Sequence, residues 1–180
     1  MKRTIFNPIQ QDTLTFVQTA AETAGQLSEL GITMLPGGGN ALHYHTTYTE
    51  TFTAITGTLG LELEKKRKLL LTPGESYVIK LGEVHRFFNP GDTPITFRNV
   101  VLLGHEGFEN TLRILYGLAA DGLYNEKGLP KSIMHLAVCA IMSDTRLPGL
   151  GNLLTPVFRL LASFARWQGI EAQLLDRYCR

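Results

Sequence analysis

The stretch Gly37 to Gly57, GGGNALHYHTTYTETFTAITG, carries two histidines and a glutamate at a spacing that suits a metal ion. His43 and His45 are two residues apart, so on a strand their side chains point to the same face. Glu50 follows, and the stretch from Gly74 to Asn89 adds a third histidine. Imidazole and carboxylate groups are good ligands for divalent iron, manganese, nickel, zinc or cobalt. The sequence therefore predicts a metal site made of His43, His45, Glu50 and His85.

The residues around this stretch read as short strands separated by glycine and proline turns. Thr49 to Thr56 alternates with period two and places Glu50 and Phe52 on one face. The expected strands cover residues 14–17, 31–35, 49–56, 59–64, 69–72, 76–81 and 95–103. The basic run from Lys65 to Lys68 falls at a hairpin tip, where its charge also discourages edge pairing. Many short strands of this kind indicate a β-sandwich or barrel.

The pattern changes to a helical period near Gly107. Apolar residues recur with helical spacing from Phe108 to Ala120, and Ser132 can cap a second helix. Pro156 lies in the favoured first turn of a third helix. The apolar stripe of this third helix is Val157, Leu160, Leu161, Phe164 and Ala165. We therefore predict a barrel domain at residues 1–106 and a C-terminal helical extension at residues 107–180.

Composition excludes several classes of protein. The chain has 180 residues, of which 44% are apolar, so it can bury one core of ordinary size. The net charge of +1 lacks the basic excess of a nucleic-acid binder. We expect no membrane span, because no apolar run reaches about 18 residues, and a cytoplasmic location, because no signal peptide is recognisable. Cys139 and Cys179 are expected to be reduced thiols.

The two spaced patterns resemble the motifs of the cupin superfamily. The first motif is glycine, five residues, His-x-His, three or four residues, glutamate, six residues, glycine, and Gly37 to Gly57 fills every fixed position. The second motif is glycine, five residues, Pro-x-Gly, two residues, histidine, three residues, asparagine. Its matching residues are Gly74, Gly82, His85 and Asn89. Lys80 stands where the family has proline, which should affect a turn and not the ligands.

This resemblance implies a mainly β protein, an antiparallel jelly-roll barrel of the RmlC-like cupin kind, followed here by a C-terminal helical segment. It also implies a divalent transition metal (Fe, Mn, Ni or Zn) held by His43, His45, Glu50 and His85. More loosely, the whole chain is similar to a group of bacterial cupin-2 proteins with a helical tail. The short segments that are similar are Leu14 to Phe16, Leu71 to Glu75, His85 to Gly91 and Gly107 to Glu109. That group has no settled activity, so the likeness predicts the site better than the reaction.

Each residue of the site also has a structural interpretation. The three histidines could line a barrel that has lost its metal, and Glu50 could orient a histidine instead of binding the ion. Tyr44 and Tyr48 flank the ligands, and rim or outer packing suits them better than catalysis. Phe52 and Phe87 are interpreted as core or pocket wall. The two remaining histidines are placed outside the site, His105 at the strand-to-helix joint and His135 in a helix.

Three uses of such a site stay open at this stage. We expect a mononuclear, dioxygenase-like enzyme that acts on a small, partly apolar molecule, with Glu50 also serving as a base. A non-catalytic cupin that binds or senses a small ligand is the first alternative. A metal-dependent isomerase or lyase is the second. We expect a homodimer, because barrels of this family commonly pair through their sheets. The stripe of the third helix would pack on the barrel or a second subunit, or else touch a membrane.

Overall fold

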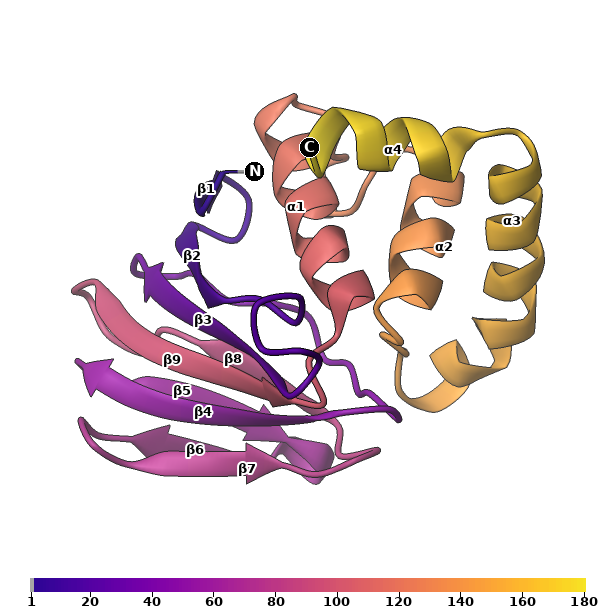
Figure 1. Cartoon of the computed structure of the whole chain (residues 1–180). Helices are drawn as coiled ribbons and strands as arrows, with labels where there is room; N and C mark the ends of the chain where they lie inside the picture. The colour runs from indigo at the N-terminus through magenta and orange to yellow at the C-terminus, as the bar shows by residue number, and fades with distance from the viewer. Residues whose placement is uncertain (1) are drawn as a thin grey trace.

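Two antiparallel sheets form a barrel at one end of the molecule (Figure 1). The computed structural model describes residues 2–180. The larger sheet has the order β1 (Thr4–Asn7), β2 (Asp12–Gln18), β3 (Leu27–Met34), β9 (Ile95–Leu102), β4 (Thr49–Thr56) and β7 (Ser76–Ile79). The smaller sheet has the order β6 (Lys68–Leu71), β5 (Leu59–Leu63) and β8 (His85–Phe88). The expected jelly-roll fold is confirmed.

The inner faces of the two sheets share one apolar core. On β4 the residues Glu50, Phe52 and Ala54 are buried while their neighbours are partly exposed, so the predicted alternation is confirmed. The same alternation appears along β9, which pairs with β4 on one side and β3 on the other. The largest fully buried members of this core are Tyr48, Phe16, Phe52, Phe97, Leu30, Met34, Leu59 and Leu61.

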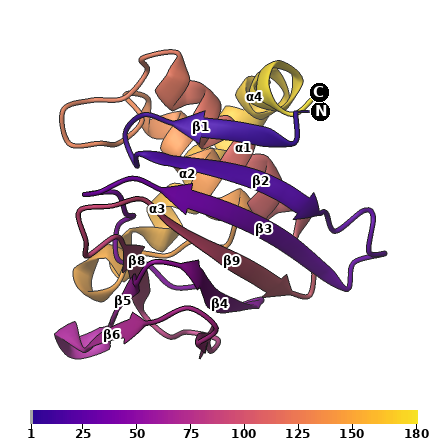
Figure 2. The ribbon, with the colours of Figure 1, turned by 90° about the vertical axis from the view of Figure 1, so that its left-hand side faces the viewer.

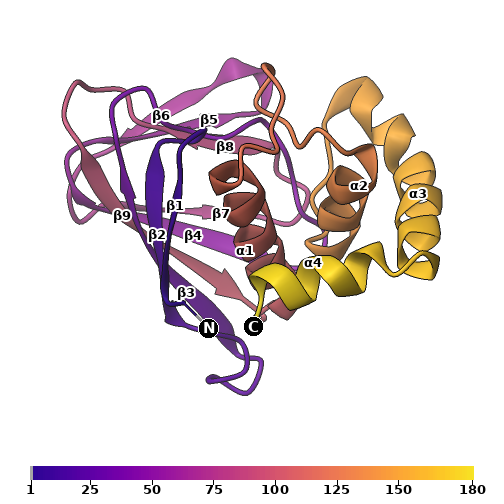
Figure 3. The ribbon, with the colours of Figure 1, turned by 90° about the horizontal axis from the view of Figure 1, so that it is seen from above.

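Four helices follow the barrel and lie beside it (Figures 1 and 3). They are α1 (Glu106–Ala120), α2 (Ile133–Met142), α3 (Thr155–Trp167) and α4 (Ile170–Tyr178). Helix α1 lies next to β1, and the turned view shows the helices behind the larger sheet (Figure 2). A second apolar cluster joins the four helices and includes Ile114, Leu118, Val138, Ala165 and Leu174.

The chain changes from strand to helix between Leu102 and Glu106. His105 is the N-cap of α1, and its Nδ1 accepts a hydrogen bond of 2.9 Å from the amide of Phe108. Ser132 caps α2 in the same way, as its sequence position predicts. The basic run forms an exposed turn that includes the short 3-10 helix η1 (Glu64–Lys66), which agrees with the expected hairpin tip.

Several elements differ from the sequence interpretation. Strands β1 and β8 and helix α4 were not predicted, and β3 begins at Leu27, four residues before its expected start. In β1 the fully buried residue is Asn7 while Phe6 is exposed, and the burial of β8 does not alternate, so neither strand shows apolar residues with a period of two. Helix α4 buries only Leu174 fully, so its apolar stripe is weak.

Candidate metal centre

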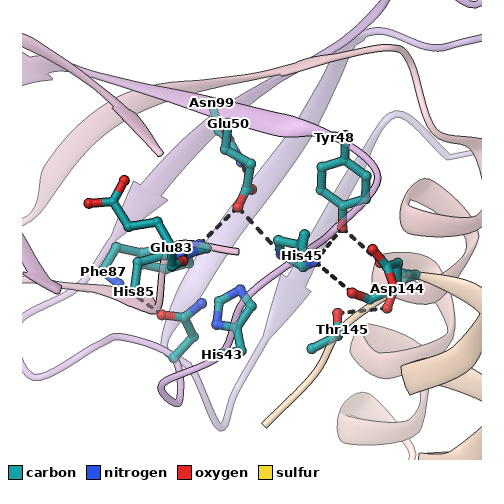
Figure 4. Close-up of polar contacts among 12 residues, drawn as sticks. His43, His45, Tyr48, Glu50, Glu83, His85, Phe87, Asn99, Asp144 and Thr145 are labelled. Atoms are coloured by element: carbon teal, nitrogen blue, oxygen red, sulfur yellow. Dashed lines mark hydrogen bonds and ion pairs between the residues drawn. The ribbon is translucent and has the colours of Figure 1, made fainter. Parts of the chain in front are cut away.

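Three segments of the barrel bring His43, His45, Glu50 and His85 together (Figure 4). His43 and His45 lie in the extended segment before β4, Glu50 is on β4, and His85 begins β8. His43 and His85 form an isolated antiparallel bridge, with backbone hydrogen bonds of 3.0 and 2.8 Å. One ligand atom from each of the four side chains lies within 4.8 Å of the others.

Glu50 occupies the centre of this cluster. Its Oε2 lies 2.9 Å from Nε2 of His85 and 3.4 Å from Nε2 of His45. Its Oε1 accepts a hydrogen bond of 2.7 Å from the side-chain amide of Asn99 on β9. Burial alone would raise the pKa of Glu50, but the two histidines hold that pKa well below its usual value. The carboxylate is therefore anionic and can bind a cation.

The pKa values of two histidines are shifted in opposite directions. Burial, with the neighbouring His85 and His45, lowers the pKa of His43 to about 3, so its imidazole is neutral. Burial also acts to lower the pKa of His85, but the hydrogen bond and charge of Glu50 outweigh it and raise that pKa. His85 and Glu50 therefore form an ion pair within the cluster.

Backbone carbonyls fix the orientation of two of the rings. Nδ1 of His43 lies 2.8 Å from the carbonyl oxygen of Ala41, and Nδ1 of His85 lies 3.0 Å from that of Glu83. A carbonyl only accepts, so each Nδ1 carries the proton and donates. This leaves Nε2 of both rings directed at the centre of the cluster, the arrangement that metal-binding histidines adopt.

His45 is held by the helical part of the chain as well as by the barrel. Its Nδ1 lies 2.8 Å from the hydroxyl of Tyr48 and 3.2 Å from the carbonyl oxygen of Asp144. The Tyr48 hydroxyl in turn donates to the carbonyl of Ser143 at 2.8 Å. Asp144 has a left-handed φ of 49°, and its carboxylate accepts a hydrogen bond of 2.5 Å from the amide of Thr46. The segment after α2 thus closes over the imidazole of His45.

The donor set of this cluster fits a divalent transition metal. Nε2 of His45 is buried, yet it makes no hydrogen bond among the described residues. A buried nitrogen without a partner is costly, and a cation at the centre would satisfy it. Three imidazoles and one carboxylate also suit iron, manganese, nickel or zinc. The residues would leave part of the coordination sphere open to small molecules.

The sequence interpretation was wrong for Tyr48. This side chain is only 2% exposed, and its ring stacks on His45 with centroids 4.5 Å apart. Tyr44 does face outward as expected, where its hydroxyl donates to Asn152 at 2.8 Å. Asn99 and Asp144 were missed because their positions carry no motif and they come close to the cluster only through the fold.

Replacing Tyr48 by phenylalanine should weaken metal binding by roughly 10-fold, the lower end of the effect of removing an outer hydrogen bond to a ligand. The change keeps the ring and removes the acceptor that lies nearest to Nδ1 of His45. Metal titration calorimetry of the variant measures the effect. Tyr44→Phe is the matched control, because its hydroxyl contacts Asn152 outside the cluster. Equal weakening in both variants would contradict this role of Tyr48.

The other residues singled out from the sequence have structural positions. Phe52 is fully buried and Phe87 partly, and their ring centroids lie 5.7 Å apart in the core. His135 lies on α2, outside the cluster. Asn89 closes a turn by donating to the carbonyl of Thr93 at 2.8 Å. The amide of Lys80 donates to the side chain of Glu83, a hydrogen bond that the proline of the motif could not make.

The motif glycines serve the backbone. Gly37, Gly57, Gly74 and Gly82 all have φ between 70° and 90°. At Gly57 a Cβ atom would also lie 2.6 Å from the side chain of Ile95. Glycine is therefore required at this turn by both conformation and space.

Comparison with known proteins agrees with this geometry. Residues 32–102 match the family described as the cupin domain. These residues form a cupin domain. The matched residues contain all four members of the cluster, whereas the four helices lie outside the match. No curated protein matches the sequence.

Several solved structures are similar to the cupin barrel. The polyketide cyclase RemF from Streptomyces resistomycificus is 22% identical, over 52% of this chain and 66% of the cyclase, with a TM-score of 0.47. A predicted oxalate decarboxylase from Thermotoga maritima is 18% identical, over 51% of this chain and 80% of its own, with a TM-score of 0.48. An RmlC-like cupin from Shewanella frigidimarina is 15% identical, over 58% of this chain and 86% of its own, with a TM-score of 0.49. The chain thus spans just under two thirds of the cyclase, and none of these likenesses indicates an activity for it.

Proposed function

We propose that this cupin is a mononuclear metal-dependent enzyme of the dioxygenase-like kind that acts on a small, partly apolar molecule. The observation that carries the proposal is the cluster of three histidines and one glutamate, with ligand atoms within 4.8 Å and an unpaired buried nitrogen on His45. When bound, a redox-active divalent metal would supply the means to hold substrate and dioxygen side by side.

The side chains around the centre would orient the substrate and move its proton. Asn99 fixes Oε1 of Glu50, which leaves Oε2 as the atom that would accept a proton from the substrate. Apolar rings surround the cluster and would keep bulk water away from that transfer. Phe52 lies 6.1 Å from the His85 ring and Phe108 lies 6.3 Å from the His45 ring, measured between centroids.

The test is oxygen uptake by Glu50→Gln beside the wild type. The iron-, manganese- and nickel-loaded proteins are screened against catechols, flavonols, β-diketones and thiols. We expect substrate-dependent oxygen uptake in the wild type and a loss of about 10²- to 10⁴-fold in the variant, because glutamine cannot accept the proton. Metal content is measured on the same samples, so that a loss of metal is separated from a loss of the base.

Glu75→Gln is the matched control for this experiment. Glu75 is an exposed glutamate whose side chain accepts hydrogen bonds from the amide and the hydroxyl of Thr72, outside the cluster. This variant should consume oxygen like the wild type. Unchanged uptake in Glu50→Gln with full metal content would contradict the role of Glu50 as the base.

A ligand-binding or sensor function is the second candidate, and a cavity favours it. The cavity has a volume of about 180 Å³ and lies between α2, α3 and the segment Asp144 to Leu147. Its lining includes Leu136, Ile141, Phe158 and Arg159, together with Arg146 and Asp144, which pair with each other at 3.1 Å. A small apolar molecule with one negative group suits this lining. The carbonyl of Asp144 also contacts His45. Binding of a molecule in this cavity would therefore affect the metal centre. Tight binding of such a molecule without turnover in any metal form would favour the sensor.

The proposal also covers the partners and the cellular location of the protein. The net charge of +1 supports the absence of nucleic-acid partners. Both cysteines are buried and free, which supports a reducing, cytoplasmic location. Among residues 2–180, no helix combines the length and apolar character needed to cross a bilayer. We also propose that the protein is a homodimer.

A further inference from the structure

Helix α3 and the end of the 3-10 helix that leads into it, η2 (Gly149–Leu154), expose a row of large apolar side chains on the side away from the rest of the molecule. Leu153, Leu160 and Trp167 are 72%, 73% and 79% exposed, and Val157 and Phe164 between them are 48% and 44% exposed. Successive members are four, three, four and three residues apart, which is the spacing of a coiled-coil seam. These five residues are called the outer row.

The outer row is not the face by which α3 packs on its own chain. Ala162 and Ala165 are buried, and Ala165 belongs to the apolar cluster of the helical part. Figures 1 and 3 show α3 as the element farthest from the barrel, with α2 on its inner side. The helix is therefore apolar on two faces, and only one of them is covered within the chain. Exposed apolar rows of this size mark sites of association.

Charge favours a protein partner over a membrane surface. The residues that flank the outer row are Leu154, Pro156, Leu161, Ser163 and Gln168, and none of them is charged. The helix carries only Arg159 and Arg166, and Arg166 is paired with Glu171 at 3.0 Å. A helix that lies on anionic lipid shows several cations along its polar face. A seam flanked by uncharged residues instead brings two copies together without repulsion.

The exposed area is large enough for a stable pair. The outer row with Leu154 offers on the order of 700 Å² of exposed side chain, given about 150–250 Å² for a fully exposed large residue. A standard interface buries about 800 Å² on each partner. Burial of apolar area on this scale is the main favourable contribution to association.

We infer that the outer row of α3 is the surface on which a second copy of this chain docks, with the two α3 helices antiparallel about a two-fold axis. This inference takes the number of copies from the homodimer proposed above. It does not depend on the metal chemistry. Antiparallel pairing places Leu160 against its own copy. It sets the bulky Trp167 and Phe164 against the smaller Leu153 and Val157, which fills the seam evenly. Parallel pairing would set Trp167 against itself.

The first test is Leu160→Asp, measured by sedimentation and light scattering beside the wild type. Two carboxylates would meet on the axis, so the dissociation constant of the dimer should rise at least about 100-fold. Leu70→Asp is the matched control, since Leu70 is 58% exposed but lies on β6 of the barrel. Circular dichroism and cobalt binding are measured on every variant. Both should be unchanged, which separates this interface from the metal site.

The only tryptophan gives an independent reading of the same interface. Trp167 is 79% exposed in a single chain, so pairing would cover it. Its fluorescence should shift to longer wavelength when the wild type is diluted, and it should be shifted at all concentrations in Leu160→Asp.

A charge pair tests the antiparallel direction. Leu153→Lys and Trp167→Glu should each weaken the dimer, and the double variant should recover it, because each new lysine would face the new glutamate of the partner. Recovery would support the antiparallel seam, and no recovery would overturn it.

Three outcomes would overturn the inference in distinguishable ways. A wild type that is monomeric at all concentrations would remove the homodimer itself. A dimer that persists in Leu160→Asp but is lost in Leu70→Asp would place the interface on the barrel. A monomer that floats with vesicles of anionic lipid, and loses this binding in Leu160→Asp, would assign the row to a membrane.

Discussion

Replacing His45 by alanine is expected to lower the affinity for a divalent transition metal by at least about 100-fold, more than the loss of an outer hydrogen bond to a ligand. The variant loses the buried Nε2 atom that has no other partner and lies 3.4 Å from Glu50. Elemental analysis of protein purified without a histidine tag measures the metal content. A metal titration followed by calorimetry gives the change in affinity.

Thermal unfolding gives a second reading of the same loss. A metal that binds only the folded state at 100 times its dissociation constant adds about 2.7 kcal/mol to the free energy of unfolding. The wild type should therefore melt at a higher temperature with added metal, and His45→Ala should show little change. Equal metal content in the two proteins, with the fold intact by circular dichroism, would rule out this ligand assignment.

His135→Ala is the control for these measurements. His135 is on α2 and lies outside the cluster of four candidate ligands. Its loss removes an imidazole from the chain but none from the centre. Metal content and the stabilisation by metal should match those of the wild type.

The sequence predicted the long strands of the large sheet and also the four-residue strands β6 and β7, but it missed β1 and β8. Strand β4 has eight residues and one buried face, so alternation alone identifies it. Strand β8 has only four residues, HRFF, and its pairing with β5 comes from the closure of the barrel. Strand β8 is therefore specified by its neighbours in space, which a local pattern does not contain.

The four clustered residues were predicted because their spacing is local. His43, His45 and Glu50 fall within eight residues, and His85 belongs to the second spaced motif. The groups that hold His45 from the helical side could not be predicted, because Asp144 is 99 positions away from it. Asn99 was missed for the same reason, since it reaches Glu50 across the pairing of β4 with β9.

The sequence predicted the helices as an extension separate from the barrel. This division of the chain into residues 1–106 and 107–180 stays a proposal. Contacts of the helical part with the barrel are polar as well as apolar. The hydroxyl of Tyr116 on α1 donates to Asp12 on β2 at 2.8 Å, and both residues are buried. Arg113 on α1 lies over the ring of Phe16, with its guanidinium carbon 3.7 Å from the centroid. Buried polar contacts of this kind are not visible in a hydrophobic period.

The second large expected effect comes from Asp12, whose ionisation should lower the stability of the folded protein as the pH rises. Burial raises the pKa of its carboxyl to about 6, against the lowering effect of the hydrogen bond from Tyr116. In the unfolded chain the pKa is about 3.9, so between about pH 4 and pH 6 the folded state binds more protons. The contribution of Asp12 to stability is therefore fully present below about pH 4 and is lost as the pH rises through about 6. A shift of about two pKa units corresponds to about 3 kcal/mol.

Asp12→Asn should remove this dependence, because an asparagine oxygen still accepts from Tyr116 and carries no charge at any pH. Urea unfolding of the wild type and the variant, repeated between pH 4 and pH 7.5, measures the difference between the two proteins and cancels the other titrating groups. We expect the variant to gain about 3 kcal/mol relative to the wild type as the pH rises over this range. Asp176→Asn is the control, since Asp176 is an exposed partner of Arg180, and its difference from the wild type should be flat. A flat difference for Asp12→Asn as well would mean that Asp12 ionises in the fold without cost, and that water reaches the contact between α1 and β2.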